Sequence, residues 1–139
     1  MKYGSLIIEK KEYVYLKRIL NVSGYAEDHE TQKCLMKLSE ELKTAQIVSE
    51  EEMPKDIIRF NSIVTLVLEN GLEKKLQVVI PTERNIKQNK ISILTPMGSA
   101  LIGYSKEDTI FWDFPGGKQQ LKIIDVTQEE TFSGLDIVM

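Results

Sequence analysis

Residues 91–103 read ISILTPMGSALIG, which predicts a short strand that runs directly into a short helix. The first four residues are mostly apolar and β-branched, which favours a strand. Thr95 can accept a hydrogen bond from the first turn of a helix, and Pro96 suits the first helical position because no N–H is needed there. Residues 100–102 give the helix an apolar face, and Gly103 is typical of a helix end. We therefore expect a strand–helix unit whose helix is covered by a sheet.

A second motif lies downstream, where residues 113–118 read DFPGGK. Proline followed by two glycines is typical of a tight turn between two strands. Two upstream segments accompany it, the sequence SEEEMP at residues 49–54 and the pair Asn61 and Ser62. Together these motifs resemble the C-terminal domain of the Gre transcript-cleavage factors, and within that family they are most similar to the Rnk (regulator of nucleoside diphosphate kinase) branch. The resemblance covers roughly residues 45–126, and the N-terminal helices more loosely.

The composition of the 139 residues is ordinary for a globular domain, with 42% hydrophobic and 28% charged residues. A net charge of −3 argues against binding nucleic acid by phosphate neutralisation alone and favours a protein partner. Cys34 is the single cysteine, so we expect no internal disulfide and no cysteine-based metal site. We also expect no cofactor. The sequence shows neither a membrane span nor a signal peptide, so a cytoplasmic location is expected.

Two short helices are predicted before residue 50. In the first helix Tyr13, Leu16 and Leu20 recur at intervals of three and four residues, which is helical spacing. The second helix begins near residue 28 or 30 and carries the seam pattern of a coiled coil. Its seam residues are Leu35, Leu38, Leu42 and Ala45. Because a short loop joins the helices, we expect a short antiparallel helical hairpin (a coiled coil) over residues 1–50, projecting roughly 20–30 Å.

After residue 50 the apolar period changes to two, which predicts strands. Four of the expected strands comprise residues 62–68, 73–80, 109–114 and 118–126. The turn Glu69-Asn70-Gly71 is a strong hairpin signal between the first two. This order alone predicts only an α+β fold. The resemblance implies more: an FKBP-like antiparallel sheet wrapped around the short helix, forming a domain over residues 51–127, with a tail over residues 128–139.

Acidic residues gather at the predicted tip of the helical hairpin, at Glu27, Asp28 and Glu30. In cleavage-competent Gre factors, tip carboxylates enter the secondary channel of RNA polymerase and help to hold the second catalytic magnesium, an ion that prefers oxygen ligands. The alternative is that these carboxylates cap the helix N-terminus and complement its dipole. Resemblance to the Rnk branch implies a shortened hairpin that does not stimulate cleavage. The single histidine, His29, is expected to be solvated, and Cys34 to be a packing residue.

Aromatic side chains in the sheet domain form another candidate site. They are Tyr104, Phe111, Trp112 and Phe114. FKBP-type prolyl isomerases hold a proline ring in an aromatic pocket, whereas large side chains are also needed simply to fill a core.

A protein-docking surface is the third candidate site, because the Gre C-terminal domain binds the rim of the polymerase secondary channel. Loops on a rigid sheet are where binding residues collect. The resemblance implies contacts from the loop at residues 82–90 and from the helix start at residues 95–98. The partner-binding residues that we single out are Met97, Tyr104, Pro115, Gly116 and Gly117.

We therefore expect a bacterial RNA polymerase-binding transcription regulator of the Gre/Rnk type, which docks near the secondary channel and is not an enzyme. We expect no catalytic residue, no metal, no membrane contact and no direct sequence-specific contact with nucleic acid. A monomer is expected, although apolar residues in the tail, between Leu135 and Val138, leave self-association open. Two alternatives stand beside this hypothesis: a transcript-cleavage stimulator that uses the tip carboxylates, and an FKBP-like prolyl isomerase or peptide-binding module.

Overall fold

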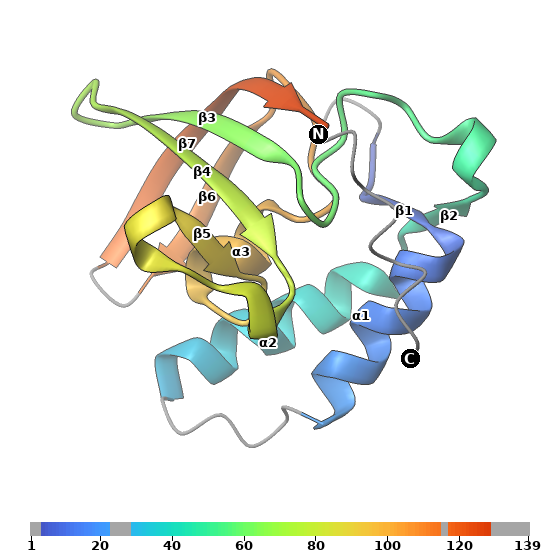
Figure 1. The fold of residues 1–139 in the computed structure, drawn as a ribbon. Helices are drawn as coiled ribbons and strands as arrows, with labels where there is room; N and C mark the ends of the chain where they lie inside the picture. Colours follow the sequence, from blue (N-terminus) through green and yellow to red (C-terminus); the bar gives the residue numbers. More distant parts are fainter. Residues whose placement is uncertain (1–3, 23–28, 115–116, 129–139) are drawn as a thin grey trace.

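The computed structural model describes residues 4–22, 29–114 and 117–128, in which two N-terminal helices precede a five-stranded sheet (Figure 1). The elements are β1 (Ile7–Glu9), α1 (Lys10–Val22), α2 (His29–Leu42), β2 (Gln46–Val48), η1 (Glu50–Glu52), β3 (Ile63–Leu68), β4 (Glu73–Val79), η2 (Pro81–Glu83), η3 (Ile86–Gln88), β5 (Lys90–Ser92), α3 (Pro96–Leu101), β6 (Thr109–Phe114) and β7 (Gly117–Thr127). Strands β1 and β2 pair in parallel, so the chain before α1 is joined to the chain after α2.

The large sheet has the strand order β5-β4-β3-β7-β6. Strand β3 pairs antiparallel with β4 and β7, and β6 pairs antiparallel with β7. Strand β5 pairs parallel with β4, so the expectation of a wholly antiparallel sheet was wrong at this edge. The reason is the connection at residues 80–89, which contains η2 and η3. It brings the chain back beside Gln77, so that β5 then runs along β4 in the same direction.

Both expected hairpins are present. In the first, Gly71 adopts a φ of +83°, and the N–H of Leu68 donates to the carbonyl of Leu72 at 2.9 Å. The side chain of Asn70 accepts from the N–H of Leu72 at 3.0 Å, which is the turn chemistry predicted from Asn-Gly. In the second hairpin the last residue of β6, Phe114, pairs with the first residue of β7, Gly117.

The strand–helix unit at residues 91–103 forms as predicted, although β5 ends at Ser92. Thr95 caps α3, because its hydroxyl accepts from the N–H of Gly98 at 3.0 Å, and Pro96 is the first helical residue. Gly98 lies so close to β5 that an added Cβ would stand 2.2 Å from the carbonyl oxygen of Ser92. Gly103 has a φ of +86°, and a Cβ added there would stand 3.0 Å from the side chain of Ile8 and 3.1 Å from that of Leu6.

One hydrophobic cluster joins the N-terminal helices to the sheet. Helix residues Leu16, Leu38 and Leu42 belong to it. The sheet side contributes Val64, Leu66, Leu121 and Ile123, and α3 contributes Ala100 and Leu101. Leu35, Leu38 and Leu42 are all buried, as the seam pattern predicted, but α2 contacts α3 and β6 as well as α1. Helix α2 therefore packs onto the sheet domain, at least in part, and does not project freely from it over its whole length. None of the described helices has the length and apolar character that crossing a membrane requires.

The close approach of α3 to β5 leads to a first prediction. In Gly98→Ala the new methyl group would overlap backbone atoms of Ser92 and Ile93, so α3 or β5 must shift. We expect the free energy of unfolding, measured by urea denaturation, to fall by about 1–3 kcal/mol.

Gly71→Asn is the matched control, because nothing lies within 4 Å of a Cβ at Gly71 and asparagine tolerates its positive φ. An unchanged unfolding midpoint for Gly98→Ala would contradict the tight packing of α3 on β5.

Candidate functional site

The predicted partner-binding residues occupy different environments. Met97 lies in the first turn of α3 and is half-buried against the core, and Gly117 is exposed at the start of β7 with a φ of +116°. Tyr104 is buried, and its hydroxyl donates to Oε2 of Glu41 on α2 at 3.1 Å. Burial, followed by the nearby Glu41 carboxylate, raises the pKa of Tyr104. Tyr104 thus ties α2 to the sheet domain and offers little surface to a partner.

Several predicted residues lie outside the described part of the chain. Pro115 and Gly116, and the tip residues Glu27 and Asp28, are among them. Glu30 and His29 belong to the first turn of α2, but their side chains are not described, and the same holds for Trp112 and Phe114 on β6.

The exposure of the side chain is described for two of the four aromatic residues in the sheet domain. Tyr104 belongs to the buried cluster, whereas Phe111 is 69% exposed and does not. The structure therefore does not bring these two rings together in one pocket. Cys34 is buried in the core, which confirms its predicted packing role. Among the described residues no group of three or more histidine, cysteine, aspartate or glutamate side chains is arranged to hold a metal ion.

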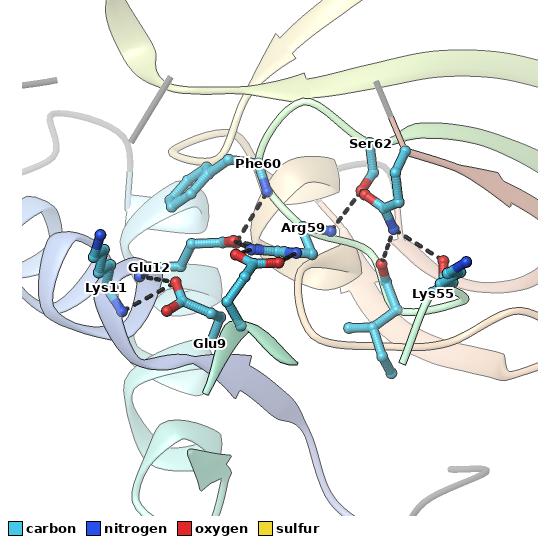
Figure 2. A network of polar contacts seen from close by, with 10 residues as sticks. Glu9, Lys11, Glu12, Lys55, Arg59, Phe60 and Ser62 are labelled. Carbon is cyan, nitrogen blue, oxygen red and sulfur yellow. Dashed lines mark hydrogen bonds and ion pairs between the residues drawn. The ribbon is translucent and has the colours of Figure 1, made fainter. Parts of the chain in front are cut away.

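A buried ionic network is the polar feature that the sequence patterns did not reveal. Arg59 lies in an apolar run with Ile57, Ile58 and Phe60, all of them buried. Its Nε donates to Oε2 of Glu12 at 2.6 Å, and its two terminal nitrogens donate to the two carboxylate oxygens of Glu50 at 2.7 Å each. Figure 2 shows Arg59 beside the side chain of Glu12.

Glu12 is the inner partner of this network, with a side chain only 4% exposed. Its second oxygen, Oε1, accepts from the backbone N–H of Phe60 at 3.3 Å. Burial raises the pKa of Glu12 to about 7, and the charge and hydrogen bond of Arg59 oppose that rise. At Glu50 the hydrogen bond from Arg59 dominates and lowers the pKa of the carboxyl. The network thus joins α1, η1 and the segment that leads into β3.

Neighbouring hydrogen bonds hold the ends of this network in place. Glu9 precedes α1, and its carboxylate accepts from the N–H groups of Lys11 and Glu12 at 3.0 and 3.1 Å, which caps the helix (Figure 2). At η1, Oε1 of Glu52 accepts from both the N–H and the hydroxyl of Ser49. The bond from the Ser49 N–H is the one that a capping box makes between its first and fourth residues. Both ends of the network therefore belong to capped helical turns.

Gln128 makes a second set of contacts beside Arg59. Its Nε2 donates to the carbonyl oxygens of Ile57 and Lys55 at 2.6 and 3.1 Å, and its Oε1 accepts from the hydroxyl of Ser62 at 2.6 Å. The Ser62 hydroxyl in turn accepts from the N–H of Arg59 at 2.7 Å. Gln128 therefore fixes the end of β7 to the segment before β3, although the sequence analysis had assigned it to the tail.

An open pocket of about 600 Å³ adjoins this network. Its lining residues are Glu50, Glu51, Met53, Pro54, Lys55, Arg59, Val126, Thr127 and Gln128. Of the three side chains in the network, Glu50 and Arg59 line the pocket and Glu12 does not. Because the guanidinium of Arg59 is already bound by two carboxylates, the network mainly supports the wall of the pocket. A lone arginine between apolar residues is the one sequence signal that could have indicated it, because a buried cation needs anionic partners.

Comparisons with known proteins agree with the motifs. Residues 53–128 match the family described as transcription elongation factor, GreA/GreB, C-term. The chain is 32% identical over 99 residues to the regulator of nucleoside diphosphate kinase of Escherichia coli strain K12, covering 70% of this chain and 73% of the relative. It is 32% identical over 114 residues to transcription elongation factor GreA of Bartonella henselae, covering 76% of this chain and 73% of the relative.

A solved structure extends the likeness to the helices. The prokaryotic transcription elongation factor GreA/GreB from Nitrosomonas europaea superposes with a TM-score of 0.70 at 31% sequence identity. The alignment covers 89% of this chain and 98% of that one. The arrangement of the N-terminal helices and the mixed sheet is therefore shared with a solved member of that group.

The raised pKa of Glu12 generates a prediction about pH. In the folded protein this carboxyl titrates near pH 7, above its ordinary value of 4.5, so the folded state binds the proton more tightly than the unfolded state does. The free energy of unfolding should therefore fall as the pH rises from about 4.5 to about 7, by up to about 1.4 kcal/mol per pH unit from this group.

Urea denaturation of the wild type and of Glu12→Gln across this range isolates the contribution of Glu12 as the difference between the two curves. Glu51→Gln, which changes an exposed carboxylate in η1, should follow the wild-type curve. Parallel curves for the wild type and Glu12→Gln would show that Glu12 does not titrate in this range.

The asymmetry of the two ion pairs generates another prediction. Arg59→Met leaves the buried Glu12 without its cation and should lower the free energy of unfolding by about 3–5 kcal/mol at about pH 8. Glu50→Gln changes a carboxylate whose side chain is 59% exposed, and should cost less than about 1 kcal/mol.

The double variant Arg59→Met with Glu12→Met tests the cause. Replacing both charges by apolar groups of similar volume should recover most of the stability lost in Arg59→Met. A double variant as unstable as Arg59→Met would show that packing of the arginine stem, and not charge, explains the loss.

Proposed function

This chain belongs to the Gre family of transcription elongation factors, and we propose that it is a regulator that binds bacterial RNA polymerase near the secondary channel without catalysis of its own. The observation that carries the proposal is the family match over residues 53–128, which includes the strand–helix unit and the turn quoted from the sequence. Those motifs had indicated the same family, and the likeness to the solved relative spans the helices too.

The proposed docking surface consists of the start of α3, the β6–β7 turn and the loop before β5. The Thr95 cap and the close approach of Gly98 fix the first turn of α3, so Met97 is presented from a rigid base. Gly117 is exposed where β7 begins, and we propose that it binds the partner together with Pro115 and Gly116. Tyr104 would act chiefly through its bond to Glu41, by positioning α2 relative to this surface.

The two helices are short, so they are better suited to obstructing a channel than to carrying a reactive group into it. Helices α1 and α2 contain 13 and 14 residues, which corresponds to about 20 Å each. We propose that they form a short hairpin that occupies the channel entrance and competes with Gre factors whose hairpins are longer. In this proposal residues 1–50 form the hairpin and residues 51–127 the docking domain, as a monomer in the cytoplasm, and Glu27, Asp28 and Glu30 do not act in transcript cleavage.

Binding to RNA polymerase tests the proposal directly. We expect immobilised full-length chain to retain purified bacterial core polymerase, and an excess of a longer-hairpin Gre factor to release it, because both would use the same rim. Retention that does not exceed an empty matrix would contradict the proposal. In a stalled elongation complex we expect no shortening of the transcript, and shortening would favour a cleavage stimulator instead.

A further inference from the structure

An isoleucine in the loop before β5 is unusually accessible. Ile86, the first residue of η3, is 87% exposed, the largest value among the exposed large hydrophobic side chains that the structure describes. Leu72, at the turn between β3 and β4, is 58% exposed by comparison. Isolated apolar residues are common on protein surfaces, so exposure alone does not indicate a function. The construction of the loop around Ile86 supplies the further argument.

The loop holds Ile86 in a defined conformation. Asn85 and Lys90 exchange two backbone hydrogen bonds of 2.9 Å, which close the loop at its base. Within it, the side chain of Asn85 accepts from the N–H of Gln88, and Asn89 adopts a left-handed φ of +57°. The carbonyl of Asn89 then accepts from the N–H of Gln77 on β4 at 2.9 Å. Ile86 is therefore presented on a pre-ordered turn, and binding through it would cost little conformational entropy.

The charge around Ile86 is opposite to that of the whole chain. The chain has a net charge of −3, but the segment at residues 81–90 carries Arg84, Lys87 and Lys90 against the single carboxylate of Glu83. These cations are exposed or half-buried and flank the isoleucine. An apolar side chain with cations close to it in the chain is complementary to an apolar pocket with a rim of carboxylates. A nucleic acid would use the cations but would gain little from the isoleucine, so a protein surface fits better.

We propose that Ile86 is an anchor residue that enters a carboxylate-rimmed apolar pocket on RNA polymerase, with Arg84, Lys87 and Lys90 facing the rim. This inference rests on the proposed function and specifies one contact within it. Continuity supports the assignment, because β5 leads from this loop directly into α3, whose first turn carries Met97. In Figure 1 the yellow loop between β4 and β5 lies at the β5 edge of the sheet.

The test measures association and dissociation rates of the full-length chain with purified bacterial core polymerase. Ile86→Ser should raise Kd by about tenfold or more, mostly through faster dissociation, because an apolar anchor is lost. Leu72→Ser makes the same chemical change at another exposed turn and should leave Kd within about twofold. Lys87→Gln should slow association and flatten its salt dependence, whereas Lys74→Gln on β4 should do neither.

Other results would overturn either the role of Ile86 as an anchor or the proposed binding to polymerase. Equal Kd values for Ile86→Ser and Leu72→Ser would overturn the anchor and leave the proposed function standing, provided that the wild type binds. Absence of wild-type binding would overturn both. Loss of affinity for RNA in Ile86→Ser, with polymerase binding unchanged, would assign the loop to nucleic acid and overturn the proposal. Thermal unfolding of every variant should match the wild type, since these side chains are exposed.

Discussion

The guanidinium of Arg59 is buried, so its positive charge must be neutralised by carboxylates that lie beside it. Its partners come from the two ends of the helical segment: Glu12 from the first turn of α1 and Glu50 from the turn that follows β2. Removing charges from water is costly, so the buried ions Arg59 and Glu12 are each tolerated only while the other stays in place. The network therefore holds α1, η1 and the entry to β3 in one arrangement, next to β1 and β2, which pair the ends of the helical segment.

Apolar packing acts on the same arrangement from the other side. Leucines of α1 and α2 share one cluster with the inner face of the sheet and with α3, and Tyr104 adds a hydrogen bond from the sheet domain to α2. Close-packed interiors resist small displacements, so the helices and the sheet domain are mechanically coupled. A partner that binds the sheet domain would thereby also orient the helices, which is a useful property in a regulator proposed to bind a rim and obstruct a channel.

The surface proposed for docking combines rigid backbone with accessible side chains. A capped first turn supports Met97, and paired backbone bonds together with a left-handed asparagine support Ile86. Pre-ordered loops lose little entropy on binding, so modest contacts can yield useful affinity. The chain as a whole is acidic, but the Ile86 loop is positively charged. In the proposed complex this charge would orient the chain as it approaches an acidic partner.

Local patterns were sufficient to predict the strand–helix unit, both hairpins, the two helices and the buried seam leucines, because turns, caps and apolar periodicity depend on residues close together in the chain. The same patterns could not predict that β5 runs parallel to β4, since the direction of a strand depends on the path of the connection before it. Nor could they pair Arg59 with Glu12 and Glu50 or assign Gln128 to the site, because these partners meet only when distant segments pack together. Family membership followed from the residues themselves, whereas the coupling of helices to sheet and the presentation of Ile86 were decided by tertiary contacts, which place charges and apolar groups from remote parts of the chain within reach of one another.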